Sequence, residues 1–95
     1  MSESRTENQW VVYMLECQDG TYYTGITNHL ERRITEHNDS SPKSKAARYT
    51  RSRQPVKIIY SENCENRQDA SKKEFAIKKL SRRQKEKLVH KHVSP

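Results

Sequence analysis

Residues 10–37 read WVVYMLECQDGTYYTGITNHLERRITEH, and this stretch predicts two strands followed by a helix. Its first six residues form an apolar run rich in β-branched and aromatic side chains, which is typical of a strand buried on both faces. Asp19 and Gly20 form a pair that accepts positive φ at low cost, so they predict the turn of an antiparallel hairpin. The second strand is then residues 22–24, and Gly25 ends it.

The helix is predicted by Asn28 and Glu31, which have the spacing of a capping box. It should begin near Asn28 and run for roughly three turns. Arg33 and His37 share a face of this helix, beside an apolar stripe formed by Leu30 and Ile34. Two ionisable groups are therefore expected next to the buried side of the helix.

Residues 56–60, VKIIY, are β-branched enough to predict a third strand in the same sheet. A polar connection over residues 61–66 should follow. Asn66 and Asp69 then suit the start of a helix that runs to about Leu80.

A last helix is predicted by a second capping-box pattern at residues 81–84. The expected fold is an α/β (α+β) domain of order β-β-α-β-α-α, in which a small three-stranded sheet is flanked by helices. In the penultimate helix, Glu74 falls between Ala70 and Ile77 on the apolar side. A carboxylate that faces inward needs a partner.

The composition indicates one small basic domain. With 95 residues there is room for a single core, which we place at residues 10–90, between a disordered tail (1–9) and a frayed end (91–95). The net charge of +7 points to a polyanionic partner, most simply nucleic acid, and a merely solvated surface is the alternative.

No apolar segment approaches the ~20 residues needed to span a bilayer, and the first nine residues contain no hydrophobic signal core. We therefore expect a cytoplasmic protein without a membrane partner. Cys17 and Cys64 lack the spacing of a zinc or dithiol motif, so both are predicted to be free thiols.

The segment between the first helix and the third strand is predicted to be a flexible phosphate-binding loop. Residues 43–53 contain no acidic residue and five cations, namely Lys43, Lys45, Arg48, Arg51 and Arg53. Such cations neutralise backbone phosphates, and an interleaved aromatic ring offers a base a stacking surface. Tyr49 either has this stacking role or packs back onto the core.

The motifs VVY (11–13) and YTG (23–25), followed by Arg33, resemble those of the GIY-YIG nuclease domain at these spacings. The likeness continues through residues 49–60 and 73–85. It covers nearly the whole chain, from Trp10 to about Leu88, and is strongest to the small stand-alone bacterial members.

In GIY-YIG nucleases the motif tyrosines activate or orient the attacking water, and the matching positions are Tyr13 and Tyr23. A phenol is a poor base at neutral pH, so a nearby cation or His37 has to favour its phenolate. We expect Tyr13 to be the base and Tyr23 to position water or phosphate, with the opposite assignment also open. The alternative for both is a purely structural place in the core.

Arg33 is expected to bind the scissile phosphate through its planar fork, and the alternative is a surface pair with Glu31 or Glu36. His37 is expected to assist proton transfer or to contact phosphate, unless it only forms a structural hydrogen bond to a tyrosine. Gly25 should permit close approach of the backbone to substrate or of helix to strand, with a simple turn as the alternative.

The family places its metal-binding glutamate in a comparable helix, and Glu74 is the matching position. A single carboxylate suits one Mg²⁺ or Mn²⁺ that keeps several waters and takes further oxygens from phosphate. The alternative for Glu74 is a buried salt bridge to Arg33 or a lysine. The resemblance implies a divalent-metal-dependent endonuclease that cleaves DNA with low sequence specificity and selects DNA structure, in repair or recombination.

The chain departs from the family pattern in three places. The first motif lacks its glycine, Ile26 stands where some members have a lysine, and no asparagine follows Glu74. The last two differences bear on catalytic strength, so the alternative is a non-catalytic nucleic-acid-binding module or an interaction subunit. Larger members add a separate DNA-reading domain, and without one we expect low specificity or a protein partner that supplies it.

Overall fold

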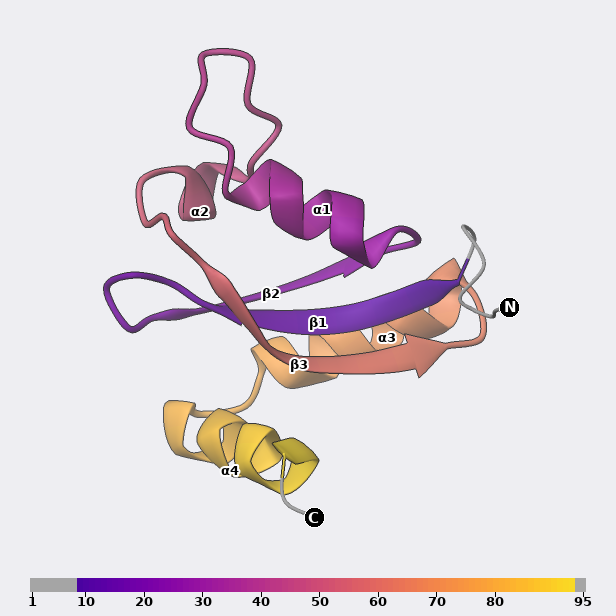
Figure 1. Cartoon of the computed structure of the whole chain (residues 1–95). Coiled ribbons are helices and arrows are strands. Elements are labelled where there is room, and N and C mark those ends of the chain that lie inside the picture. The colour runs from indigo at the N-terminus through magenta and orange to yellow at the C-terminus, as the bar shows by residue number, and fades with distance from the viewer. Residues whose placement is uncertain (1–8, 94–95) are drawn as a thin grey trace.

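The computed structural model describes residues 9–93 as a three-stranded antiparallel sheet with helices on both faces (Figure 1). The sheet has the order β2-β1-β3. In chain order the elements are β1 (Trp10–Glu16), β2 (Tyr22–Thr27), α1 (Leu30–His37), α2 (Arg48–Arg51), β3 (Lys57–Cys64), α3 (Arg67–Lys78) and α4 (Arg82–Val93). The predicted α+β fold is confirmed, and the short helix α2 is an addition within the segment expected to be a loop.

β1 is the central strand, and its residues 11–15 are buried, as its apolar run predicts. Alternate side chains enter two separate clusters. Val11, Tyr13 and Leu15 lie with Leu30 of α1, whereas Val12 and Met14 lie with residues of α3. The tyrosine at position 13 is thereby placed on the α1 face of the sheet.

β3 extends further than its apolar residues indicate. Residues 61–64 continue the strand and pair with residues 10–13 of β1, so the predicted polar connection is wrong over these four positions. Backbone hydrogen bonds to β1 do not require apolar side chains, and β3 is an edge strand whose side chains can remain in solvent.

The capping predictions are confirmed for the last two helices and wrong for the first. Asn66 accepts from the Asp69 amide at 2.8 Å, and the Ser81 and Gln84 side chains bond reciprocally to each other's backbone amides. α1 instead begins after His29, whose Nδ1 accepts from the Arg32 amide at 3.4 Å. Because β2 continues to Thr27, α1 is limited to eight residues.

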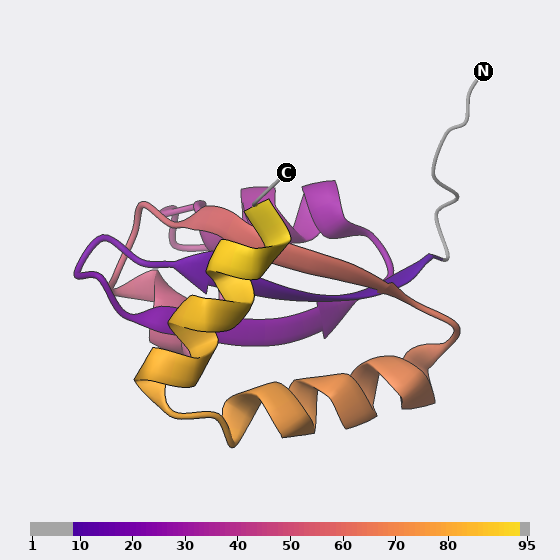
Figure 2. The same ribbon diagram turned by 90° about the horizontal axis from the view of Figure 1, so that it is seen from below.

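The helices form two layers. α1 and α2 lie over one face of the sheet, while α3 packs under β1 and β2 and α4 lies under β3 (Figures 1 and 2). Cys17 and Cys64 are buried and free, as predicted. Within residues 9–93, no helix is long and apolar enough to cross a membrane. The tail at 1–8 and residues 94–95 lie outside the described residues.

Candidate active site

The hydroxyl of Tyr13 is the point at which the predicted catalytic residues meet. It is hydrogen-bonded to Nε2 of His37 at 2.9 Å, and Arg33 acts on it by charge and by a hydrogen bond. The Tyr23 ring lies 6.4 Å from the Tyr13 ring and 5.1 Å from the His37 ring, between centroids. The hairpin and α1, which are adjacent in sequence, thus bring four of the five predicted residues into one cluster.

Gly25 makes room for this cluster. It pairs with Tyr13 across the two strands, and a Cβ at this position would lie 2.7 Å from the Tyr13 hydroxyl oxygen. The close approach expected at Gly25 is therefore made by a tyrosine side chain. Because β2 is an edge strand, Tyr13 leans over Gly25 toward the edge of the sheet.

Replacing Gly25 with alanine should destabilise the protein by about 1–3 kcal/mol, the usual cost of overpacking a filled interior. The new methyl group forces Tyr13 away from His37. The measurement is urea-induced unfolding, with Gly20→Ala as the control. Gly20 has φ +85 but nothing within 4 Å of its added Cβ, so only about 1 kcal/mol of backbone strain is expected there. Wild-type stability in Gly25→Ala would contradict the packing argument.

His37 is fully buried and neutral. Burial and, secondarily, the Arg33 charge lower the pKa of His37 to about 4, although Glu36 opposes the shift. Its Nδ1 is hydrogen-bonded to Thr50 Oγ1 at 2.7 Å. The structural role considered for His37, a hydrogen bond to a tyrosine, is therefore present. The same hydrogen bond places an imidazole nitrogen beside the Tyr13 hydroxyl, where it can accept a proton.

The lowered pKa of His37 predicts a loss of stability in acid. The unfolded state takes up the proton at a pKa near 6.5, so this contribution is complete above that pH and declines as the pH falls toward 4. The shift corresponds to about 3 kcal/mol in the free energy of unfolding. Urea unfolding between pH 7.5 and 4.5 should show a shallower decline for His37→Gln than for the wild type. His90→Gln, at an exposed position, should keep the wild-type decline. Equal pH dependence in all three would contradict a neutral His37.

Arg33 lies beside the Tyr13 hydroxyl, as predicted, and it also forms the ion pair with Glu36 that was its predicted alternative. Its Nη1 donates to Glu36 Oε1 at 2.8 Å and to the Lys45 carbonyl at 2.8 Å. Burial alone would lower the pKa of Arg33, but Glu36 and Tyr13 raise it, so the guanidinium stays charged. A quarter of the Arg33 side chain is exposed to solvent, so a ligand that approaches the cluster can contact this cation.

Tyr13 is a neutral phenol in the free protein. Burial raises its pKa well above the usual value, Tyr23 raises it further, and Arg33 opposes the rise. At neutral pH, therefore, Tyr13 can accept a proton only if it passes its own proton on. The hydrogen-bonded nitrogen of His37 is the nearest group suited to receive it.

Glu74 belongs to α3, on the other face of the sheet from α1, and acts on Tyr13 through its charge. Its charge raises the pKa of Tyr13, as the weakest of the named influences. The Glu74 side chain is 25% exposed and forms an ion pair with Lys78 at 3.2 Å. The predicted alternative, a salt bridge to a lysine, is therefore present, but it is only half-buried. Among the described residues, no three His, Cys, Asp or Glu side chains gather as a metal site.

The basic segment folds against α1 instead of forming an open loop. Arg51 donates to the Ser44 carbonyl, and Arg53 pairs with Asp19 at 3.1 Å, so two predicted phosphate ligands have structural partners. Three remain exposed without an ion pair among the described residues, namely Lys43, Lys45 and Arg48.

Tyr49 packs back onto the candidate site, which was one of its two predicted alternatives. Its ring stacks on Tyr23 with centroids 6.1 Å apart, and the Arg53 guanidinium lies 4.0 Å from the centroid of the Tyr49 ring. The residue is nevertheless 37% exposed. An aromatic and cationic surface therefore adjoins the candidate site.

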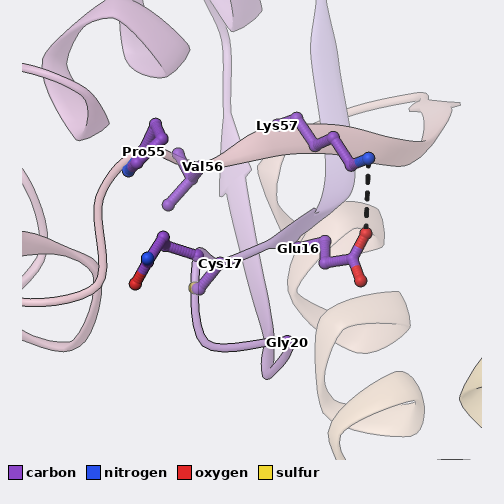
Figure 3. A pocket seen from close by; sticks show the side chains of 7 residues that line it. Glu16, Cys17, Gly20, Pro55, Val56 and Lys57 are labelled. Atoms are coloured by element: carbon purple, nitrogen blue, oxygen red, sulfur yellow. Dashed lines mark ion pairs between the residues drawn. The ribbon is translucent and has the colours of Figure 1, made fainter.

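A separate hollow of about 330 Å³ lies near the hairpin turn and contains none of the predicted site residues (Figure 3). It is lined by residues including Cys17 and Val56, and Lys57 pairs with Glu16 beside it at 3.7 Å. Burial raises the pKa of Cys17, so its thiol is a weak nucleophile at neutral pH.

Thr50 is the contact that the sequence did not predict. It lies in the basic segment with nothing in its spacing to connect it to His37, thirteen residues earlier. By contrast, the ion pair between Glu74 and Lys78 could have been predicted from the sequence, because Lys78 lies one helical turn after Glu74.

Comparisons with known proteins identify the family and the fold of the chain. A family model described as the GIY-YIG catalytic domain matches residues 9–87. A UPF0213 protein from Desulfotalea psychrophila is 58% identical over 80 residues, which is 84% of this chain and 70% of that protein. A UPF0213 protein from Halobacterium salinarum is 47% identical over 81% of this chain and 95% of its own length.

Two solved structures share the fold. The solution NMR structure of a protein from E. faecalis has a TM-score of 0.64 and 41% identity, covering 97% of this chain and 95% of that one. The solution NMR structure of a UPF0213 protein from Bacillus halodurans has a TM-score of 0.57 and 39% identity, covering 92% and 88%. With the family model matched over residues 9–87, the chain belongs to the GIY-YIG catalytic domain family.

Proposed function

We propose that this protein is a divalent-metal-dependent endonuclease that hydrolyses DNA phosphodiester bonds. The observation that supports it most is the buried Tyr13–His37 hydrogen bond with the Arg33 guanidinium beside the same hydroxyl. A proton acceptor and a phosphate-binding cation are the groups that hydrolysis of a phosphodiester needs from a protein. Both lie at one edge of the sheet, next to a basic surface.

Glu74 is the residue that would hold the metal. GIY-YIG nucleases generally use divalent metals, and the donor chemistry here fits one hard cation, because the carboxylate is partly exposed and its ion-pair partner, Lys78, is an exposed lysine. With one protein ligand, the remaining coordination sites belong to water and phosphate. When bound, Mg²⁺ or Mn²⁺ supplies positive charge to the phosphoryl oxygens.

Tyr13 is assigned as the base of the reaction. The attacking water gives a proton to the Tyr13 oxygen while the Tyr13 proton passes to His37 Nε2, so no buried phenolate has to persist. The new P–O bond forms from the water oxygen as the bond to the leaving oxygen breaks, and the leaving oxygen takes a proton from solvent. Tyr23, more exposed than Tyr13, orients water or phosphate.

Arg33 is assigned to the scissile phosphate. The anion would compete with Glu36 for the guanidinium and would raise the pKa of the neighbouring His37, which makes the imidazole a better proton acceptor when substrate is bound. Binding and proton transfer are thereby coupled through one charge.

The surface formed by Lys43, Lys45, Arg48 and Tyr49 is assigned to DNA binding. Contacts from cations to phosphate and from an aromatic ring to a base carry little sequence information, which supports low sequence specificity. Selection of branched or otherwise distorted DNA, a place in repair or recombination, and a protein partner that adds specificity belong to the same proposal.

The test is nicking of supercoiled plasmid and cleavage of branched DNA by the purified protein, in Mg²⁺ or Mn²⁺ and in EDTA. Cleavage that requires the metal supports the proposal. The second candidate, a non-catalytic nucleic-acid-binding module, is favoured by the existing Arg33–Glu36 and Glu74–Lys78 pairs, which already occupy both charged groups. It predicts salt-dependent binding with no cleavage of either substrate.

A further inference from the structure

Thr50 is a fully buried hydroxyl residue that contacts the side of His37 opposite Tyr13. Its Oγ1 lies 2.7 Å from His37 Nδ1 and 3.1 Å from the carbonyl oxygen of Ala47, the residue that precedes α2. Thr50 is therefore the residue of α2 that contacts His37, while Tyr49 of the same helix stacks on Tyr23.

The hydroxyl proton of Thr50 limits the state of His37. A hydroxyl has one proton, and Thr50 donates it to the Ala47 carbonyl. Thr50 Oγ1 must then accept from His37, which requires the hydrogen of the neutral imidazole to be on Nδ1. Nε2 is left with its lone pair directed at Tyr13.

The requirements of Tyr13 lead to the same tautomer independently. Its hydroxyl is buried, and a buried phenol proton needs an acceptor. Among the described residues, the acceptor that contacts this hydroxyl is His37 Nε2 at 2.9 Å. The opposite tautomer would direct the Nε2 hydrogen at the Tyr13 oxygen and leave the phenol proton without an acceptor among the described residues.

We propose that Thr50 is a positioning residue that holds His37 as the Nδ1–H tautomer, so that Nε2 is free to accept the proton of Tyr13. The chain of contacts runs from Ala47 through Thr50 and His37 to Tyr13. This inference deepens the proposed hydrolytic function and rests on it for its catalytic consequence.

The test combines long-range ¹H–¹⁵N NMR of the His37 ring at pH 7.5 with single-turnover cleavage of plasmid DNA. The variants are Thr50→Val, which keeps the shape but removes the hydroxyl, and Thr50→Ser, which keeps the hydroxyl. The wild type and Thr50→Ser should show the Nδ1–H pattern. Thr50→Val should move toward Nε2–H and cleave about 10- to 100-fold more slowly at unchanged DNA affinity, the usual cost of losing a residue that orients a functional histidine.

An Nε2–H pattern in the wild type would overturn the inference even if Thr50→Val failed to fold. Wild-type tautomer and wild-type cleavage in a folded Thr50→Val would overturn it as well. Failure of the proposed function looks different, because the tautomer would change as predicted while no variant, nor the wild type, cleaved DNA. That result would leave Thr50 as the residue that sets the tautomer and remove the reaction it was assigned to serve.

Discussion

Glu74→Gln is expected to abolish metal-dependent cleavage, with a loss of at least about 100-fold in the single-turnover rate, as is common when a charge-stabilising group is removed from an active site. Glutamine keeps the size and one oxygen of the side chain but not the negative charge that a hard divalent cation requires. The measurement is cleavage of plasmid DNA at saturating protein, together with DNA affinity at the same salt concentration.

The matched control is Glu86→Gln in α4. Glu86 pairs with Arg82 in the same i,i+4 manner as Glu74 pairs with Lys78, and both changes alter the net charge by the same amount. Helical i,i+4 pairs contribute about 0.5 kcal/mol, and neither glutamate is fully buried, so both variants should remain folded. Equal cleavage by Glu74→Gln and Glu86→Gln would remove Glu74 from the site.

Arg33→Ala is expected to lower the cleavage rate by at least about 100-fold, since it removes the charge nearest the Tyr13 hydroxyl. Arg33→Lys should recover only part of the activity, because an ammonium cannot present the planar fork that binds phosphate through two bonds. The single-turnover rate at saturating protein separates this loss from weaker DNA binding.

The neighbouring Arg32 provides the control for Arg33. Its side chain is 64% exposed, and its only ion pair, to Glu36, is long at 4.0 Å in the described structure. Arg32→Ala should weaken binding about as much as Arg33→Ala through the loss of one positive charge, yet leave the rate of cleavage unchanged. A similar loss of rate in both variants would show that only general charge matters.

The sequence predicted the fold well where side-chain pattern and structure share a cause. The apolar residues 11–15 are buried because β1 is the central strand, and Asn66 caps α3 because a short polar side chain can satisfy its first amides. The sequence-based prediction failed where strand pairing determines the structure. Residues 61–64 are mostly polar, which does not indicate a strand, yet they form one through backbone hydrogen bonds to β1. The N-cap of α1 is His29 instead of the predicted Asn28, because β2 continues to Thr27.

The candidate site shows the same division. Tyr13, Tyr23, Arg33 and His37 lie on a hairpin and the helix that follows it, so local spacing was enough to bring them together. Glu74 depends on how α3 packs against the sheet, and its distance from the cluster is not set by helical periodicity. The contact of Gly25 with Tyr13 depends on the register of the two strands. The contact of Thr50 with His37 depends on the path of the long connection between α1 and β3. Neither dependence produces a recognisable pattern in the sequence.

Arg33 and Glu74 are proposed to act in one hydrolytic site with the Tyr13–His37 pair. This proposal is tested by single-turnover cleavage of plasmid DNA in Mg²⁺ by the wild type, Arg33→Ala, Glu74→Gln and the double variant. Groups that act as a unit are not additive, so the double variant should be no slower than the slower single variant, while the wild type cuts only with metal. A wild type that binds DNA and cuts none of it, or losses that multiply in the double variant, would contradict the account.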